Sequence, residues 1–213
     1  MKRVFGKICL AAIVLVFPIA AFSQSPKAIE ITRLIVGEII ENSFPELKTA
    51  NIEVRTFRSA SNYFKSQFSI ARVLTFQKPH YVIFVNAEVF RRTAPENGIR
   101  AILAHELAHV LYYESRNGFE LFGLARLASR RFTVKFERRA DLEAIARGFG
   151  EGLKSYRKWL YENIPAKAVQ AKKRDYFSPG EIDSMLKILR EKPGMIDVWR
   201  KRAPRNLKEI EAQ

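Results

Sequence analysis

Apolar positions in this chain recur mostly at helical spacing, with one strand-like stretch between two helical ones. In residues 26–41 the apolar side chains fall on about one face, and Ser25 stands where a helix N-cap would, so we expect a helix that breaks at residues 42–45. Residues 52–57, 68–76 and 81–85 are short β-like runs that predict a sheet of about three strands. An edge strand just before the next helix would be able to pair with an extended peptide. Ordinary sheet packing gives the same pattern.

The run at residues 99–111 carries the most informative motif, His105-Glu106-Leu107-Ala108-His109. Residues four apart lie on one face of a helix, so both histidines can turn an imidazole nitrogen towards a single metal ion. Glu106 lies beside that face, where a carboxylate can take a proton from metal-bound water. Chance is the alternative, but only three histidines occur in the chain and two have this spacing. The third, His80, is interpreted as a surface or turn residue.

Capping signals and the downstream pattern complete the helical prediction. Thr93 and Glu96 have capping-box spacing, with Pro95 in the first turn, and Ser178 and Glu181 repeat that spacing before another apolar helix. Residues 118–132 predict a helix covering the site, and residues 150–213 a basic helical tail. Residues 172–174 form a basic cluster, which we interpret as a solvated loop, the alternative being contact with an anionic surface.

A second candidate segment spans residues 136–144 and contains Glu137 and Asp141, again four apart. A catalytic zinc needs three protein ligands and an open position, and a carboxylate such as Glu137 completes the set begun by the two histidines. Asp141, one turn further on, can accept a hydrogen bond from the far nitrogen of a ligand histidine and so fix its tautomer. The alternative is that both acids only offset Arg138 and Arg139 on a solvated helix.

The first 23 residues have the pattern of a signal peptide. Three basic residues precede an apolar stretch at residues 8–20, and residues 21–23 offer small side chains at the two positions that a signal peptidase reads. Cleavage before Gln24 would leave one domain, residues 24–213. The alternative is an uncleaved anchor. No second apolar run of about 18 residues follows, so no integral span is expected after signal removal.

Composition narrows the expected partners. The only cysteine, Cys9, lies inside the predicted signal, so the mature protein would have to be held by its core and a metal rather than by disulfides. The net charge of +15 favours an anionic partner, although a solvated basic surface also explains it. Export makes nucleic acid an unexpected partner and leaves an anionic envelope surface as the candidate.

The two motifs together, H-E-x-x-H and then E-x-x-A-D at residues 137–141, resemble the gluzincin metallopeptidases of the HtpX-like, CAAX-prenyl-protease type. The likeness extends loosely over residues 80–210, including the Tyr176-Phe177-Ser178-Pro179 segment, which is similar to one in the soluble, exported members. It implies an α+β fold: a predominantly helical zincin-like domain with a small sheet before the H-E-x-x-H helix. One departure stands out, because Ala203-Pro204 replaces the usual His-Pro pair.

These observations favour a zinc endopeptidase that acts on exported or envelope proteins in the bacterial periplasm or outside the cell. One Zn²⁺ per chain would be held by His105, His109 and Glu137, with Glu106 as the general base in peptide hydrolysis. The sequence does not assign the residue that would stabilise the oxyanion, and the four candidates, which it does not rank, are Tyr112, Tyr113, Arg147 and His80. The alternatives are a non-proteolytic zinc-containing chaperone or assembly factor, against which Glu106 argues, and a basic module that binds an anionic surface.

Overall fold

A computed structural model describes residues 25–69, 78–116 and 130–212. The fold is α+β and mostly helical with one small sheet, which confirms the predicted class. The elements in chain order are α1 (Pro26–Ser43), the 3-10 turn η1 (Pro45–Leu47), β1 (Ile52–Thr56), β2 (Phe64–Phe68), β3 (Tyr81–Val85), α3 (Glu88–Arg91), α4 (Glu96–Glu114), α6 (Arg130–Ala146), α7 (Gly150–Asn163), α8 (Ala166–Asp175), α9 (Pro179–Glu191), α10 (Met195–Lys201) and α11 (Leu207–Glu211).

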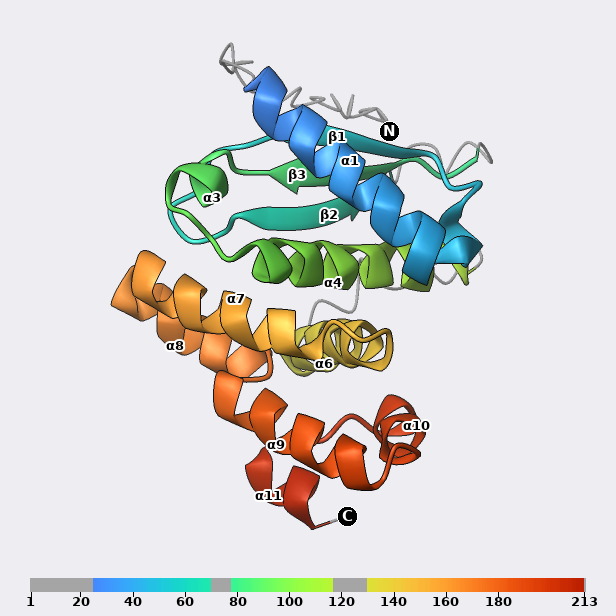
Figure 1. Ribbon diagram of the computed structural model, residues 1–213, viewed down its shortest axis with the longest axis vertical. Coiled ribbons are helices and arrows are strands. Elements are labelled where there is room, and N and C mark those ends of the chain that lie inside the picture. Colours follow the sequence, from blue (N-terminus) through green and yellow to red (C-terminus); the bar gives the residue numbers. More distant parts are fainter. Residues whose placement is uncertain (1–24, 70–77, 117–129, 213) are drawn as a thin grey trace, which may run out of the picture.

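The sheet has the strand order β1-β3-β2, with β1 parallel and β2 antiparallel to β3. Ile83 at the middle of β3 is opposite Val54 on β1 and Ser66 on β2. The prediction of β3 as an edge strand is therefore wrong: β3 is central, and β2 is the edge strand next to α4 (Figure 1). The strand β2, Phe64–Phe68, was not predicted, and the strand predicted at residues 68–76 lies almost wholly outside the described residues.

Helix α1 crosses the sheet and contacts β1, β3 and α4 (Figure 1). It begins at Pro26 with Ser25 as its N-cap residue, as expected, although the Ser25 hydroxyl makes no capping hydrogen bond. The helix runs through Ser43 and so ends within the predicted break at residues 42–45. It ends at Phe44 because Pro45 follows, and a residue before proline is driven out of the helical conformation.

Helix α4 lies at the centre of the protein, between the sheet on one side and α6 and α7 on the other (Figure 1). Residues 101–110 are all buried, as expected for a helix covered on every face. The capping box predicted at Thr93 is wrong: α4 begins at Glu96, its N-cap is Pro95, and no side chain caps it. Thr93 has a φ of 50°, whereas an N-cap residue has extended backbone angles.

The contact between α4 and α7 is close enough to exclude any side chain at Gly152. A Cβ atom there would meet the main-chain oxygen of Asn97 and would lie 2.9 Å from the Cβ of Ala101. Real side chains do not approach this closely, so the two helices pack backbone to backbone at this point. This contact sets how α7 is placed along α4, and therefore which α7 residues reach the centre of the molecule.

The C-terminal helices form a second layer with its own apolar cluster, which includes Leu142, Phe177 and Trp199. The helical tail is confirmed, and so is the second capping box: the Ser178 Oγ accepts from the main-chain N–H of Glu181 at 3.3 Å. The solvated loop predicted at residues 172–174 is wrong, because they form the last turn of α8.

The predicted signal at residues 1–23 lies outside the described residues. So does nearly all of the covering helix predicted at residues 118–132, of which only residues 130–132 are described, at the start of α6. Within the described ranges, no helix combines the length and apolar character needed to cross a membrane.

Candidate metal centre

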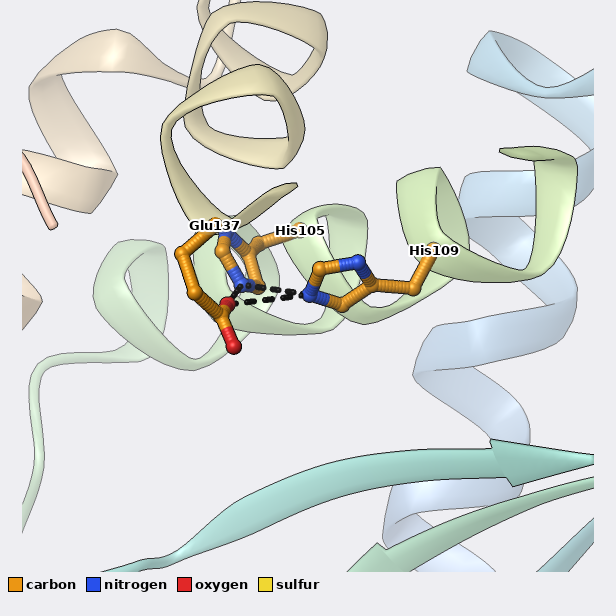
Figure 2. A group of neighbouring side chains, drawn as sticks. All are labelled: His105, His109 and Glu137. Atoms are coloured by element: carbon orange, nitrogen blue, oxygen red, sulfur yellow. Dashed lines mark hydrogen bonds and ion pairs between the residues drawn. The ribbon is translucent and has the colours of Figure 1, made fainter. Parts of the chain in front are cut away.

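The two motif histidines lie one turn apart on α4 and point to a common centre (Figure 2). His105 and His109 are 1% and 5% exposed, and their Nε2 atoms are 3.1 Å apart. The four-residue spacing brings the side chains onto one face, and the packing of α6 against α4 buries that face. The structure therefore gives the arrangement that the sequence spacing predicts.

Glu137 reaches the same centre from α6, as predicted (Figure 2). Its Oε2 atom lies 3.2 Å from His105 Nε2 and 3.1 Å from His109 Nε2. The three donor atoms thus form a nearly equilateral triangle. Zinc bonds of ~2.0–2.1 Å at tetrahedral angles would place ligand atoms about 3.3 Å apart. The group fits a metal ion in its spacing, and its members are two imidazoles and one carboxylate.

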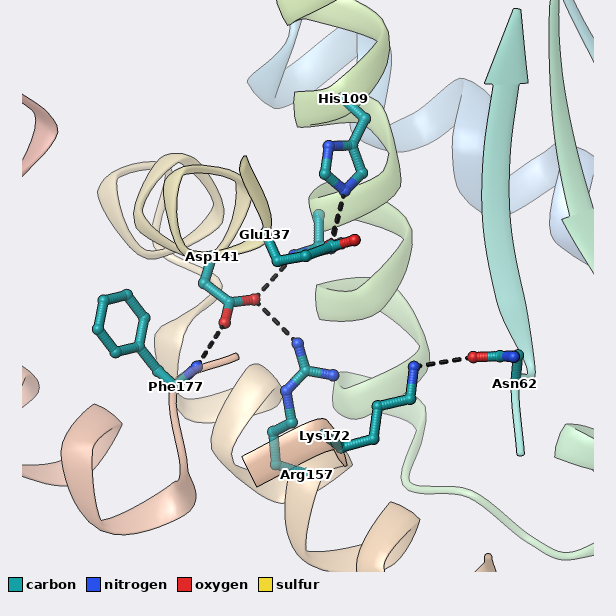
Figure 3. Close-up of polar contacts among 8 residues, drawn as sticks. Asn62, His109, Glu137, Asp141, Arg157, Lys172 and Phe177 are labelled. Atoms are coloured by element: carbon teal, nitrogen blue, oxygen red, sulfur yellow. Dashed lines mark hydrogen bonds and ion pairs between the residues drawn. The ribbon is translucent and has the colours of Figure 1, made fainter. Parts of the chain in front are cut away.

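Asp141 fixes the orientation of His105. It is fully buried, and its Oδ1 atom lies 2.8 Å from His105 Nδ1 and 2.9 Å from Arg157 Nη2 (Figure 3). The main-chain N–H of Phe177 donates to Oδ2 at 3.0 Å. A proton on Nδ1 leaves the lone pair of His105 Nε2 directed at the centre of the triangle, which is the state that a metal ligand needs.

The solvated-helix alternative for Glu137 and Asp141 is wrong. Arg138, which the alternative paired with these acids at the surface, is itself buried. It lies 3.2 Å from the Glu181 carboxylate and donates to the main-chain oxygen of Pro204. The acids of α6 face the histidines, and this arginine faces the C-terminal layer.

Electrostatics at the site favour positive charge between the ligand atoms. Burial disfavours the charged form of His105, but Asp141, Glu137 and Glu106 outweigh burial and raise its pKa to about 9. Burial would raise the pKa of Glu137, yet His109 and His105 hold it well below its ordinary value. Burial likewise opposes ionisation of Asp141, but Arg157 and His105 keep the pKa of Asp141 low. Both carboxylates are therefore anions at neutral pH.

Glu106 is buried and lines a small cavity next to the triangle. The cavity has a volume of about 20 Å³ and is shared with His105, Tyr176 and Lys172. That is about the space needed for one water molecule. A larger cavity of about 310 Å³ is lined by His109 together with Tyr112 and Phe136.

The candidate oxyanion donors named from the sequence are mostly engaged elsewhere. Arg147 is ion-paired with Glu46 and Glu143, and His80 lies 3.1 Å from the Glu53 carboxylate, so His80 takes no part in the metal triad, as interpreted.

The two tyrosines on α4 are also in aromatic contacts. The guanidinium of Arg116 lies over the Tyr112 ring, and the Tyr113 ring packs against Phe68 and Phe136.

Three residues beside the site were missed by sequence reasoning as functional residues. Arg157, Lys172 and Tyr176 all line the cavity that holds Glu106. Lys172 appeared only as part of a basic cluster, and Tyr176 only in the tail resemblance. Nothing in the local sequence marks them, because each comes to the site through the packing of α7 and α8.

Comparison of the chain with protein-family models, with curated proteins and with solved structures finds no match. The likeness to HtpX-like gluzincins therefore stays a prediction that rests on the residues of the two motifs.

Proposed function

We propose that this protein is a zinc-dependent endopeptidase of the gluzincin type. The observation that carries the proposal is the triangle of His105, His109 and Glu137 donor atoms with sides of 3.1–3.2 Å, oriented by the buried Asp141 and flanked by Glu106. Three protein ligands leave a fourth tetrahedral position for water or substrate, which is typical of catalytic zinc. Structural zinc sites usually have four protein ligands, often cysteines.

Zinc is the preferred ion because two imidazoles and a carboxylate suit its borderline character, although manganese and cobalt accept the same ligands. When bound, such an ion supplies Lewis acidity and makes a nucleophile available at neutral pH. Glu106 would take the proton of the attacking water in the neighbouring cavity and pass it to the leaving amine. Asp141 would keep His105 in the correct tautomer throughout.

The edge strand β2 offers a means of holding substrate. Its only strand partner in the described part of the chain is β3, and it lies next to α4. An extended peptide adding to this edge would run past the metal ligands, with its main chain hydrogen-bonded to β2. The predicted signal peptide makes exported or envelope proteins the proposed substrates.

The test compares the wild-type protein with Glu106→Gln and Glu137→Gln variants. Zinc per chain is measured after dialysis, and cleavage of unfolded casein is followed in the same samples. We expect near-stoichiometric zinc in the wild type and in Glu106→Gln, cleavage by the wild type alone, and loss of both zinc and cleavage in Glu137→Gln.

Glu96→Gln is the matched control, since Glu96 lies on the same helix but is exposed. It should keep both zinc and cleavage. A wild-type protein that takes up no zinc on reloading would refute the proposal. Zinc binding without any cleavage would favour the non-proteolytic assembly factor.

A further inference from the structure

Lys172 is a half-buried cation that makes no ion pair with the residues that the structure describes. It lies in the last turn of α8, and its Nζ atom donates to Asn62 Oδ1 at 2.8 Å (Figure 3). Within the described residues, no carboxylate comes within the 4.0 Å of an ion pair to this Nζ. Burial and the nearby guanidinium of Arg157 both lower the pKa of Lys172, while Glu137 and Glu106 favour its charged form.

Such a charge is costly to the fold and needs a reason. A cation removed from water loses hydration that only a counter-charge or several hydrogen bonds restore. Lys172 has one hydrogen bond to a neutral amide and the face of the Tyr176 ring, 4.7 Å away. Two of its three ammonium protons are left for another acceptor.

The position of the ammonium points to that acceptor. Lys172 lines the small cavity together with His105, Glu106 and Tyr176, and the Tyr176 ring also contacts the ring of His105. Arg157 lines the cavity as well, but its guanidinium is paired with Asp141, so Lys172 supplies the uncommitted positive charge beside His105 and Glu106.

The loop before β2, whose Asn62 side chain accepts from Lys172, is itself held in place by hydrogen bonds. Asn86, buried just after β3, donates from its side-chain amide to the main-chain oxygens of Ser59 and Asn62. Asn62 in turn accepts from Lys172, so the ammonium is tied through the loop before β2 to the end of the central strand. Helix α8, which carries Lys172, and this loop, which accepts from it, together hold the ammonium beside the cavity, as a preorganised donor requires.

We propose that Lys172 is a further catalytic residue, the donor that stabilises the oxyanion formed on the scissile carbonyl. The inference rests on the proposed peptidase function. Water oxygen bonds to the carbonyl carbon, the π electron pair moves to the carbonyl oxygen, and the water proton goes to Glu106. The ammonium of Lys172 donates a hydrogen bond to that oxygen while it is negative. The oxygen then regains its double bond, the C–N bond breaks, and Glu106 returns the proton to the amine.

The first test removes the charge and keeps the length of the side chain. Lys172→Met should lower kcat on a casein-derived peptide by about 10²–10³-fold, the usual effect of deleting one oxyanion donor, and leave KM and zinc content nearly unchanged. Asn62→Ala breaks the same hydrogen bond but keeps the ammonium, so it should cost less than about tenfold. Lys173→Met removes the next, exposed lysine and should have no effect.

A binding measurement separates this role from a structural one. A phosphinic peptide of the same sequence carries a tetrahedral anion, and calorimetry gives its affinity for the zinc-loaded protein. Lys172→Met should weaken that affinity by the same factor as kcat/KM, whereas substrate binding to Glu106→Gln/Lys172→Met should match binding to Glu106→Gln alone. If Lys172→Met does not fold, Lys172→Gln takes its place in both tests, because a glutamine keeps a donor towards Asn62 but has no charge.

The outcomes are distinguishable. Equal losses in Lys172→Met and Asn62→Ala, or an unchanged phosphinate affinity, would overturn the catalytic role and leave the peptidase proposal standing. A wild-type protein that neither holds zinc nor cleaves would overturn both.

Discussion

Replacing Asp141 with asparagine is the sharpest test of how the site is held. The side chain is fully buried, its Oδ1 atom lies 2.8 Å from His105 Nδ1, and it accepts from Arg157 and from the main-chain N–H of Phe177 at 2.9 and 3.0 Å. An asparagine has the same shape, but its NH₂ group would face a donor, and the guanidinium of Arg157, 1% exposed, would lose its counter-charge. Removing one partner of a buried pair costs about 3–5 kcal/mol, a large part of the ~5–15 kcal/mol that stabilises a domain.

Urea unfolding with a chelator present measures this cost without the metal. Asp141→Asn should lower the free energy of unfolding by about 3–5 kcal/mol. Zinc affinity, measured separately by competition, should fall about 10–100-fold because His105 loses its orienting acceptor. Asp183→Asn is the control, since that carboxylate is also paired with lysines but lies at the surface, and it should leave the midpoint nearly unchanged.

A double-mutant cycle decides whether the unpaired charge is the cause. Arg157→Met combined with Asp141→Asn removes both charges, so the double variant should be more stable than the sum of the single losses implies, by about 2 kcal/mol or more. A loss below about 1 kcal/mol in Asp141→Asn, or additive effects in the cycle, would refute the reasoning.

Three further predictions concern packing, capping and titration. Gly152→Ala should lower the free energy of unfolding by about 1–3 kcal/mol, because its Cβ would collide with α4. Gly37→Ala, which has open space around it in α1, should raise the free energy of unfolding by about 0.5–1 kcal/mol. Urea unfolding measures both, and equal effects would contradict the close contact at Gly152. Ser178→Ala should cost about 1 kcal/mol through loss of the α9 cap, seen as a lower Tm, and an unchanged Tm would contradict it. In the metal-free protein the pKa of His105 is raised from 6.5 to about 9. Its contribution to stability is therefore complete below pH 6.5 and is lost as pH rises through 9. Urea midpoints measured against pH should show this loss in the wild type and not in His105→Gln.

The candidate metal ligands could be predicted from the sequence because short-range geometry places two of the three. The spacing of His105 and His109 fixes both side chains on one helical face, whatever surrounds that face. Glu137 was predicted because a catalytic zinc needs a third protein ligand besides the two histidines. Asp141, one turn further along the helix, was then predicted to orient a ligand histidine. The structure brings all four together, although the segments are separated by 28 residues in sequence.

What the sequence does not show depends on long-range packing. Lys172 and Arg157 are two among many basic residues in a helical tail, and their approach to the site depends on how α7 packs along α4 at Gly152. The edge strand β2 was missed because its central residues, Lys65, Ser66 and Gln67, are polar and give no strand pattern.

Local motifs also fail where tertiary structure changes the backbone. Thr93 and Glu96 have the spacing of a capping box, but the positive φ of Thr93 belongs to the turn after α3. Ser178 has the same spacing and extended backbone angles, and there the box forms. The difference lies in the chain path before the helix, which the four-residue pattern does not encode.

The bond from Phe177 to Asp141 has a consequence for the order in which the protein becomes competent during synthesis. A growing chain that has emerged only through α6 contains all three donor residues, but it lacks both Arg157 and the N–H of residue 177 that hold Asp141 in place. The orienting carboxylate is satisfied only when α7, α8 and the start of the next segment have folded against it. A truncated or half-made chain would therefore carry the motifs without a well-oriented centre. The two motifs alone are therefore not the whole centre, because the helices that follow α6 complete it.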